Sequence, residues 1–375
     1  MISLKNKRDC CGCAACAQRC PRQCIKMLGD EEGFLYPHVD TSLCIDCGLC
    51  ERVCPHLNTC ESRMPLSIET AINPDAHIRE ESSSGGIFSL LATSTIRHGG
   101  IVFGARFNSL WEVEHGYTET QEGLASFRGS KYAQSRIGDS YSQAETFLKT
   151  GKDVLFSGTP CQIAGLRLFL QKDYDNLLCV AIACHSVPSP LVWREYLSGL
   201  GLRGIQSINF RDKSLGWEKY GLCILYDNGR KYFQRNDRNP FMQLFLHGLS
   251  TRPSCSNCPA KDGRCEADLL LGDCWGVTQM LPSLPNDHQG ISFVLCQTEK
   301  GRRAAQAVGA IGAALPLDQI VAYNGGLTNN PVSPSLRPWF WADFQTKKNK
   351  IQVIRQFAKP FLPGLAHRIK SFLHR

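Results

Sequence analysis

The stretch CCGCAACAQRCP at residues 10–21 decides how the first part of the chain folds. It spaces four cysteines as Cys-x2-Cys-x2-Cys-x3-Cys and ends on a proline. The stretch CIDCGLCERVCP at residues 44–55 repeats this spacing. Such a run is typical of 4Fe–4S binding, and in a pair of runs the fourth cysteine of each binds the other cluster.

This crossed pattern assigns the ligands of two clusters. The first-cluster site takes Cys10, Cys13, Cys16 and Cys54, and the second-cluster site takes Cys44, Cys47, Cys50 and Cys20. Residues 1–60 are therefore predicted to form a bacterial-ferredoxin-like module with two 4Fe–4S clusters. The alternative is a zinc module, because Cys-x2-Cys pairs also bind zinc. The duplicated runs and their closing Cys-Pro pairs favour iron–sulfur clusters.

Composition favours a reducing compartment. The chain of 375 residues has 20 cysteines, and cluster ligands must stay free thiolates rather than form disulfides. Nine residues of mixed character precede the first motif, without the apolar segment of a signal peptide. The longest apolar run, residues 177–184, is far shorter than the roughly 20 residues that span a bilayer. We therefore expect a cytoplasmic protein.

Beyond the module, the chain predicts a linker at 61–80 and then a mixed α/β body at 81–330, so the fold class is α+β. Predicted strands cover 100–107, 153–156, 177–184, 206–210, 222–226, 231–234, 267–271 and 291–297. Predicted helices cover 86–97, 140–150, 162–170, 190–200, 239–249 and 299–310. Asp227-Asn228-Gly229 predicts a hairpin turn.

Residues 331–375 are predicted to form a basic amphipathic tail. From residue 345 onward the chain has eight Lys or Arg residues and no acidic residue, which accounts for its whole net charge of +8. Apolar residues alternate with these charges at helical spacing, with a break near Pro360 and Pro363. Such a tail either lies on an anionic membrane surface, at the inner face, or docks on the body with its charges in water. No nucleic-acid recognition module accompanies the charge.

Three short motifs in the body suit a phosphate-bearing cofactor. The first contains Ser83, Ser84, Gly85 and Gly86 before a predicted helix, where exposed backbone N–H groups can hold a phosphate. The second contains Ser130, Lys131 and Tyr132, which supply a cation and a ring for a flavin. The third is a strand-to-helix turn with Gly158, Thr159 and Gln162. Taken singly, each could be a helix cap or a surface loop.

Four cysteines of the body predict a third-cluster site. Cys161 follows the strand-to-helix turn, where the helix N-terminus is expected to lower its pKa. Cys184 ends a buried strand, and Cys255 and Cys258 form a third Cys-x2-Cys pair. A structural zinc site is the alternative for this pair. Cys265 and Cys274 are nearby cysteines, either of which could replace one ligand.

The ordered motifs resemble the coenzyme F-420 hydrogenase/dehydrogenase beta-subunit family over residues 1–330. The resemblance rests on SSGGIFS (83–89), GSKY (129–132), GTPCQ (158–162), CHSVPSP (184–190) and ADLLLGDCWG (267–276). It implies FAD beside an iron–sulfur cluster in a flavin-binding α/β body. The extra cysteines at 265 and 274, and the tail after 345, lie outside what the resemblance explains.

With this resemblance the chain is expected to be an oxidoreductase that passes electrons between 4Fe–4S clusters and an unknown small-molecule substrate through FAD. Lys131 and His185 are the expected catalytic residues, His185 as a proton donor, and Asp273 is expected to bind the flavin ribose or to cap a turn. A redox partner protein or a ferredoxin is the expected partner. The alternative function is an electron-transfer subunit without a substrate of its own; a structural scaffold or redox sensor is a third.

Overall fold

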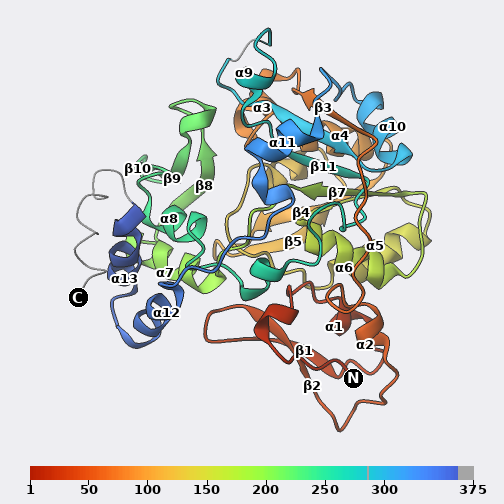
Figure 1. Ribbon diagram of the computed structural model, residues 1–375, viewed down its shortest axis with the longest axis vertical. Helices are drawn as coiled ribbons and strands as arrows, with labels where there is room; N and C mark the ends of the chain where they lie inside the picture. Colours follow the sequence, from red (N-terminus) through yellow and green to blue (C-terminus); the bar gives the residue numbers. More distant parts are fainter. Residues whose placement is uncertain (285–286, 362–375) are drawn as a thin grey trace.

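The computed structural model describes residues 1–284 and 287–361. Figure 1 shows the N-terminal module below a large sheet, with a smaller sheet and the C-terminal helices beside it. The mixed α/β fold class is confirmed. No helix in these described residues is both long and apolar enough to cross a membrane.

The module has two equivalent halves. Its elements are η1 (Lys7–Asp9), α1 (Ala15–Arg19), β1 (Ile25–Gly29), β2 (Leu35–Val39) and α2 (Leu49–Arg52). β1 and β2 pair antiparallel, with Ile25 opposite Val39. Left-handed backbone conformations recur at matching positions of the two cysteine runs, at Gly12 and Ala14 and again at Asp46 and Gly48. The duplicated spacing therefore produces a duplicated backbone.

The body is built on a seven-stranded sheet in the order β3-β12-β11-β7-β6-β4-β5. The four central strands are parallel: β4 (Ile101–Phe107), β6 (Val154–Gly158), β7 (Leu177–Ile182) and β11 (Leu269–Asp273). The outer strands, antiparallel to their neighbours, are β3 (Ser67–Ala71), β12 (Ser292–Cys296) and β5 (Val113–Thr118).

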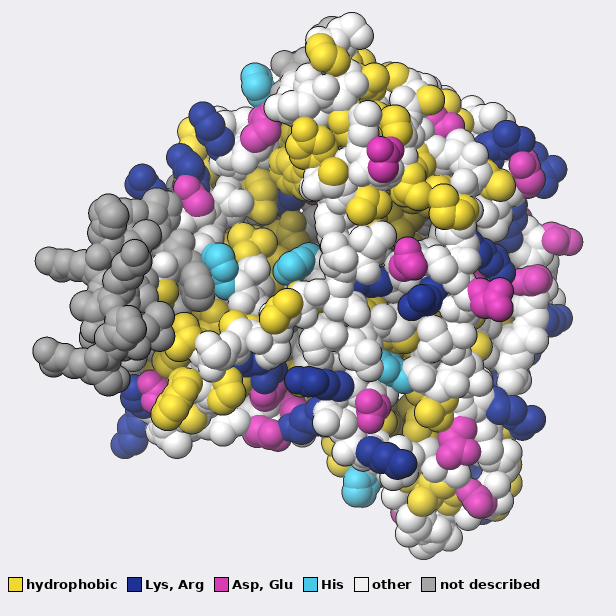
Figure 2. Space-filling model, in the orientation of Figure 1, with side chains coloured by type: hydrophobic (Ala, Val, Ile, Leu, Met, Phe, Trp, Pro, Cys, Tyr) yellow, Lys and Arg dark blue, Asp and Glu magenta, His cyan; other side chains and the backbone are white. Residues whose placement is uncertain are grey.

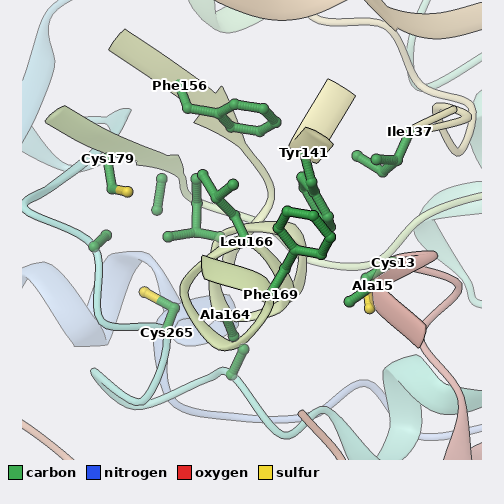
Figure 3. Packing of buried hydrophobic residues seen from close by; sticks show 14 of the residues in the cluster. Cys13, Ala15, Ile137, Tyr141, Phe156, Ala164, Leu166, Phe169, Cys179 and Cys265 are labelled. Carbon is green, nitrogen blue, oxygen red and sulfur yellow. The ribbon is translucent and has the colours of Figure 1, made fainter. Parts of the chain in front are cut away.

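Alternation along the parallel strands gives the sheet two buried faces. Phe103 and Phe156 point to one face, which packs on α5 (Ser140–Lys149) and α6 (Pro160–Leu170). Val102 and Leu155 point to the other, which packs on α4 (Ile87–Arg97) and α10 (Glu299–Ala307). Figure 3 shows the first of these cores, where α6 also meets Cys13 and Ala15 of the module. The module is thus continuous with the core of the body.

A second core surrounds a three-stranded antiparallel sheet in the order β10-β9-β8. Its strands are β8 (Ile205–Asp212), β9 (Gly221–Tyr226) and β10 (Lys231–Arg235). The predicted hairpin turn is confirmed, with Leu225 opposite Lys231 and a left-handed Gly229. The helices of this core are α7 (Pro190–Leu200), α8 (Pro240–Leu246), α12 (Arg337–Thr346) and α13 (Lys350–Ala358). Short remaining elements are α3 (Ala76–Glu81), η2 (Glu122–Phe127), η3 (Trp217–Lys219), η4 (Pro253–Asn257), α9 (Val277–Met280), α11 (Leu317–Tyr323), η5 (Gly325–Leu327) and η6 (Lys359–Phe361).

The segment 61–80 is part of the fold, so the prediction that it is a linker is wrong. Its residues 67–71 form β3, which pairs with β12 so that Ala71 lies opposite Ser292. Pro65 and Pro74 lie just outside this strand. They flank the strand and do not interrupt it, because proline lacks the N–H that a strand interior needs.

The described part of the C-terminal tail docks on the body. The amphipathic helix predicted here is present as α13, which contacts α7 and α8. Val353, Ile354 and Ala358 on α13 are buried in the second core. Of the two alternatives for the tail, α13 therefore docks on the body, because the second core covers its apolar face. Residues 362–375 lie outside the described part, and contact of the tail with a membrane stays a prediction.

Candidate functional site

A cavity of about 500 Å³ lies between the seven-stranded sheet and the three-stranded sheet. Its wall contains the carboxyl ends of β6, β7 and β11, where ligand sites of open α/β sheets gather. Figure 2 shows a hollow between these two parts of the molecule, with hydrophobic side chains in its wall and histidine at its rim. The volume is within the range of small-molecule and cofactor pockets.

The sequence-predicted cofactor residues gather in this cavity with one exception. Those in its wall are Ser83, Ser84, Gly86, Ser130, Lys131, Tyr132, Gly158, Thr159, Gln162 and Asp273, together with the predicted catalytic His185. Gly85 does not line it. A Cβ on Gly85 would lie 2.5 Å from the Ala71 carbonyl oxygen and 2.8 Å from the Ser292 amide nitrogen, so this glycine permits close packing against the sheet.

Hydrogen bonds hold the three cofactor motifs in place. The amide of Ser130 donates to Ser83 Oγ at 2.7 Å, which joins the first two motifs. At the start of α6 the amide of Thr159 donates to Gln162 Oε1 at 2.9 Å, as in a capping box. Gln162 Nε2 donates to Ser135 Oγ at 2.8 Å. The Gln162 amide is therefore engaged by the protein, and it acts by fixing the turn.

Lys131 is the cation of the cavity wall. Its ammonium group donates to the carbonyl oxygens of Arg128 at 2.9 Å and Gly129 at 3.1 Å. Burial lowers its pKa to about 7, because removing water disfavours the charged amine. An anion in the cavity would restore the charged form by supplying the missing negative partner.

His185 lines the same cavity and contacts Phe245, with the rings 6.0 Å apart and nearly perpendicular. Burial and then the nearby Lys261 ammonium lower the pKa of His185. The neutral form of His185 is therefore favoured at pH 7. To act as a proton donor, the neutral imidazole would have to give up its N–H proton or take up a second proton first. A second buried histidine, His115, also lines the cavity, and burial lowers its pKa to about 4.

The third-cluster cysteines come from separate elements and lie together. Cys161 is in the first turn of α6, Cys184 follows β7, and Cys255 and Cys258 lie in and after η4. The Cys184 thiol interacts electrostatically with the other three. Burial raises the pKa of Cys255 to about 12 and of Cys258 to about 11.

The expected lowering of the Cys161 pKa is wrong for the protein chain alone. A hydrogen bond with the Cys11 thiol, followed by burial, holds the pKa of Cys161 well above its usual value. The helix N-terminus does not offset these two effects. Iron supplies positive charge beside a coordinating thiolate. A bound cluster would therefore favour the thiolate form of Cys161 over the thiol.

Of the two substitute ligands, Cys265 is the better placed. Its buried thiol interacts with Cys258 and Cys161, and it lies 3.7 Å from Gln297 Oε1. Burial also raises the pKa of Cys274, to about 12, and the charged group that acts on that thiol is Asp273. Cys265 therefore remains the alternative ligand.

The module brings together both of its predicted cysteine sets. The Cys16 thiol interacts with Cys10 and Cys54, as the crossed first-cluster assignment requires, and burial raises its pKa to about 12. A second cavity is lined by all four cysteines of the second-cluster site, Cys20, Cys44, Cys47 and Cys50. Cys24, which the spacing does not assign, lines it too, with its Sγ 3.3 Å from Cys20 Sγ.

Each of the three predicted sets contains four cysteines, the number of thiolates that a four-iron cluster takes. Among the residues that the structure describes, no three His, Cys, Asp or Glu side chains converge closely enough to hold one metal ion. A four-iron cluster needs a wider arrangement, because each of its four thiolates binds a different iron. The four cysteines of each set suit this arrangement, and zinc stays the alternative for the Cys-x2-Cys pairs.

Sequence reasoning missed Arg211 on β8, whose guanidinium is buried in the cavity wall. It donates two hydrogen bonds of 3.0 Å to the Asp273 carboxylate and lies 3.9 Å from the centre of the Tyr220 ring. Trp217 Nε1 donates to the same carboxylate at 3.1 Å and its ring stacks on Trp275. Asp273 thus already has partners, and Arg211 Nε has none among the described residues.

Comparison with known proteins agrees with these features. Residues 9–58 match the model of the 4Fe–4S dicluster domain, and residues 151–314 match the model of the C-terminal part of the coenzyme F420 hydrogenase/dehydrogenase beta subunit. A 7Fe ferredoxin of Hydrogenibacillus schlegelii is 45% identical over 42 residues, which are 11% of this chain and 47% of that protein. The chain thus spans about half the length of this relative.

Among solved structures, the F420-reducing [NiFe] hydrogenase complex from Methanosarcina barkeri contains a similar chain. The identity is 18% and the TM-score 0.46, over 79% of this chain and 91% of that one. The match over residues 151–314 contains the motifs at 158–162, 184–190 and 267–276 that carry the family resemblance. The chain is thus similar to known proteins in two regions, to the 4Fe–4S dicluster domain over residues 9–58 and to the C-terminal part of the coenzyme F420 hydrogenase/dehydrogenase beta subunit over residues 151–314.

Proposed function

We propose that this chain is a flavin-dependent iron–sulfur oxidoreductase. FAD would bind in the cavity between the two sheets, and a third 4Fe–4S cluster would bind beside it on Cys161, Cys184, Cys255 and Cys258. The observation that carries the proposal is the position of Cys184, which lines the cavity and interacts with the other three cysteines. A cluster held there would lie at the cavity wall, within reach of the cofactor.

The cavity offers groups suited to each part of FAD. Lys131 would hold an anionic phosphate or the reduced ring, and the backbone around Ser83 and Gly86 would bind phosphate oxygens through N–H groups. Tyr132 and Trp275 present aromatic surfaces in the wall. When bound, FAD supplies the conversion between a two-electron hydride and single electrons. The protein's part is to orient the ring, exclude water and hold a proton at Lys131 or His185.

The dicluster domain makes the chain an iron–sulfur electron-transfer protein, and a redox partner protein would exchange electrons with it. The substrate of the cavity would be a small molecule that takes or gives hydride. The competing function, an electron-transfer subunit without a substrate, would need clusters but no substrate-accessible flavin. The cavity, with its cation and aromatic wall, favours the first function.

Titration of FAD into protein purified without oxygen tests the proposal, with flavin fluorescence as the measurement. One tightly bound FAD per chain would support it, and anaerobic screening of deazaflavin and nicotinamide substrates would follow. Failure of FAD, FMN and riboflavin to bind would contradict it and would leave the electron-transfer subunit as the better account.

A further inference from the structure

A buried guanidinium lies between the module and the body. It belongs to Arg252, which directly precedes η4 and is only 1% exposed. Its Nε donates to the Cys10 carbonyl oxygen at 2.8 Å, and its Nη2 donates to the Leu35 carbonyl oxygen at 2.8 Å. On the body side, its Nη1 donates to Gln134 Oε1 at 2.9 Å. Arg252 therefore joins the module to a loop of the body through neutral acceptors.

The same guanidinium reaches a ligand sulfur of the first-cluster site. Arg252 Nη2 donates to Cys10 Sγ at 3.6 Å. The module leaves room for this contact at Gly12, where a Cβ would lie 2.8 Å from Arg252 Nη1. The rings of Phe34 and Tyr36, whose centres are 5.3 and 4.4 Å from Arg252 Cζ, keep water away from the guanidinium. The module thus provides a fitted place for one cation beside Cys10.

This positive charge has no carboxylate partner among the residues that the structure describes. Its hydrogen bonds go to carbonyl and amide oxygens and to the Cys10 sulfur. Another arginine between the module and the body, Arg337, has the usual partner, because both its terminal nitrogens donate to the Glu32 carboxylate. A buried charge without a counter-charge is costly. Cys10 is the acceptor of Arg252 that becomes anionic when it binds iron, so a cluster on Cys10 would supply the counter-charge.

The second-cluster site has a different electrostatic environment. The charged groups in the lining of its cavity are Arg22, Asp46 and the Met1 ammonium group. All three residues are exposed, and the Met1 ammonium group pairs with Asp46 at 2.8 Å. Water and salt screen such exposed charges. Within the described part of the chain, the lining of this cavity therefore contains no buried cation.

We infer that Arg252 is a positioning residue for the first cluster: it supplies the counter-charge of that cluster and raises its reduction potential. A 4Fe–4S cluster with four thiolates is anionic, and it becomes more so when it gains an electron. A buried cation therefore stabilises the reduced form more than the oxidised form, and a hydrogen bond to a ligand sulfur acts in the same direction. This inference goes beyond the proposed function, because it needs neither FAD nor a third cluster.

Arg252 also acts electrostatically on Cys161 and Cys255 of the third-cluster site. Neither of these thiols accepts a hydrogen bond from Arg252, whose acceptors are those given above. A cluster on these cysteines would therefore respond to the same charge more weakly than the first cluster. The expected order of the effect is the first cluster, then the third, with the second unaffected.

The step to measure is the gain of one electron by the first cluster. Reduced methyl viologen, the mediator, loses that electron, and no covalent bond or proton is transferred. Potentiometric titration of the full chain without oxygen, followed by electron paramagnetic resonance, gives a midpoint potential for each cluster. Cys47→Ser identifies the signal of the second cluster, because this exposed cysteine is assigned to that site alone.

Arg252→Gln should shift the reduction equilibrium of the first cluster about tenfold toward the oxidised form, which for one electron is about 59 mV more negative. The second cluster should keep its potential. Arg252→Lys retains the charge and should restore most of the potential of the first cluster. An unchanged first-cluster potential in Arg252→Gln would overturn the inference, as would an equal shift in Arg252→Lys.

The matched control is the double variant Glu32→Gln with Arg337→Gln. It removes an arginine contact between the module and the body, as Arg252→Gln does, but it removes no net charge. Its cluster potentials should equal those of the parent protein. A first-cluster shift as large as that in Arg252→Gln would mean that loosening of the module, and not the charge of Arg252, sets the potential, and this would overturn the inference.

A second pair of variants decides the matter if Arg252→Gln assembles without iron. Gln134→Glu places a carboxylate at the Nη1 acceptor and so neutralises Arg252 where it stands. Gln134→Met is its uncharged control, since both variants lose the bond from Gln134 Nε2 to the Cys11 carbonyl oxygen. We expect Gln134→Glu alone to lower the first-cluster potential, again about tenfold in the equilibrium. Equal potentials in the two variants would overturn the inference. Failure of FAD to bind would refute the proposed function and leave this measurement intact.

Discussion

At the scale of single residues, the cysteines divide into those that we assign to clusters and those that we assign to the core. Cys258 and Cys265 make the sharpest comparison, because both thiols are partly or fully buried and both interact with Cys161. Cys265 has an alternative partner in Gln297, whereas Cys258 belongs to the Cys-x2-Cys pair. We therefore expect the two to behave differently when each is replaced by serine.

Cys258→Ser should lower the iron content by about four atoms per chain, because one cluster would be lost. Cys265→Ser is the control, and it should keep all the iron. Iron and acid-labile sulfide, measured in protein purified without oxygen, decide between the two cysteines. Loss of iron in Cys265→Ser with none in Cys258→Ser would exchange their roles.

Lys131→Met should weaken FAD binding about tenfold or more, since it removes a charged hydrogen-bond donor from the cavity. The exposed Lys5 provides the matched control, Lys5→Met, which should bind FAD normally. The measurement is the dissociation constant from flavin fluorescence. Unchanged affinity in the Lys131 variant would exclude this residue from the flavin site.

The pH dependence of the same measurement gives a second result. Burial lowers the pKa of Lys131 to about 7 in the free protein, and an anionic ligand favours the protonated amine. Binding therefore takes up a proton above this pKa, so affinity should fall as pH rises through about 7 and upward. In Lys131→Met this fall should disappear. A pH dependence that persists in the variant would have to come from another group.

At the scale of elements, the contact between α1 and α6 positions the module. Gly165 of α6 has no room for a side chain, since a Cβ would lie 2.8 Å from Cys13 Cβ and 3.0 Å from the Tyr141 hydroxyl. Gly165→Ala should destabilise the protein by about 1–3 kcal/mol through overpacking, less the helix-propensity gain of alanine. Urea unfolding measures the loss, and faster amide exchange in residues 10–20 would show that docking is loosened.

Gly29→Ala on β1 is the control, because nothing lies within 4 Å of the position that its Cβ would take. Its unfolding midpoint should stay close to that of the parent protein. If both alanine variants were equally stable, the close packing of α6 on the module would not contribute to stability.

Elements also show how far the sequence could predict the structure. The parallel strands β6, β7 and β11 are buried on both faces, so each is a continuous apolar run that is recognisable locally. The edge strands β3 and β5 could not be predicted, because SIETA and VEHGYT are short and mix polar and apolar residues without strict alternation. Their pairing with distant strands, and not their own sequence, makes them strands.

The residues of the candidate site also differ in whether the sequence could predict them. Cysteine spacing predicts three sets of ligands, because each set includes cysteines close together in the chain. Arg211 could not be predicted, since its partners Asp273 and Tyr220 come from other elements and no local motif marks it. Only the packing of β8 against the end of β11 brings these side chains together.

At the scale of the whole molecule, the module, the seven-stranded sheet and the second core meet near the cavity. The module lies against α6, the predicted third-cluster cysteines lie at the start of α6, after β7 and at η4, and one of them, Cys184, lines the cavity. The second core covers the cavity from the other side with β8 and α8. The proposed function therefore requires three clusters and one flavin in each chain.

The most direct test is to measure iron, acid-labile sulfide and released flavin per chain in protein purified without oxygen. The account predicts about twelve irons, from three four-iron clusters, and one FAD. About eight irons without flavin would contradict it, because only the dicluster domain would then carry redox centres.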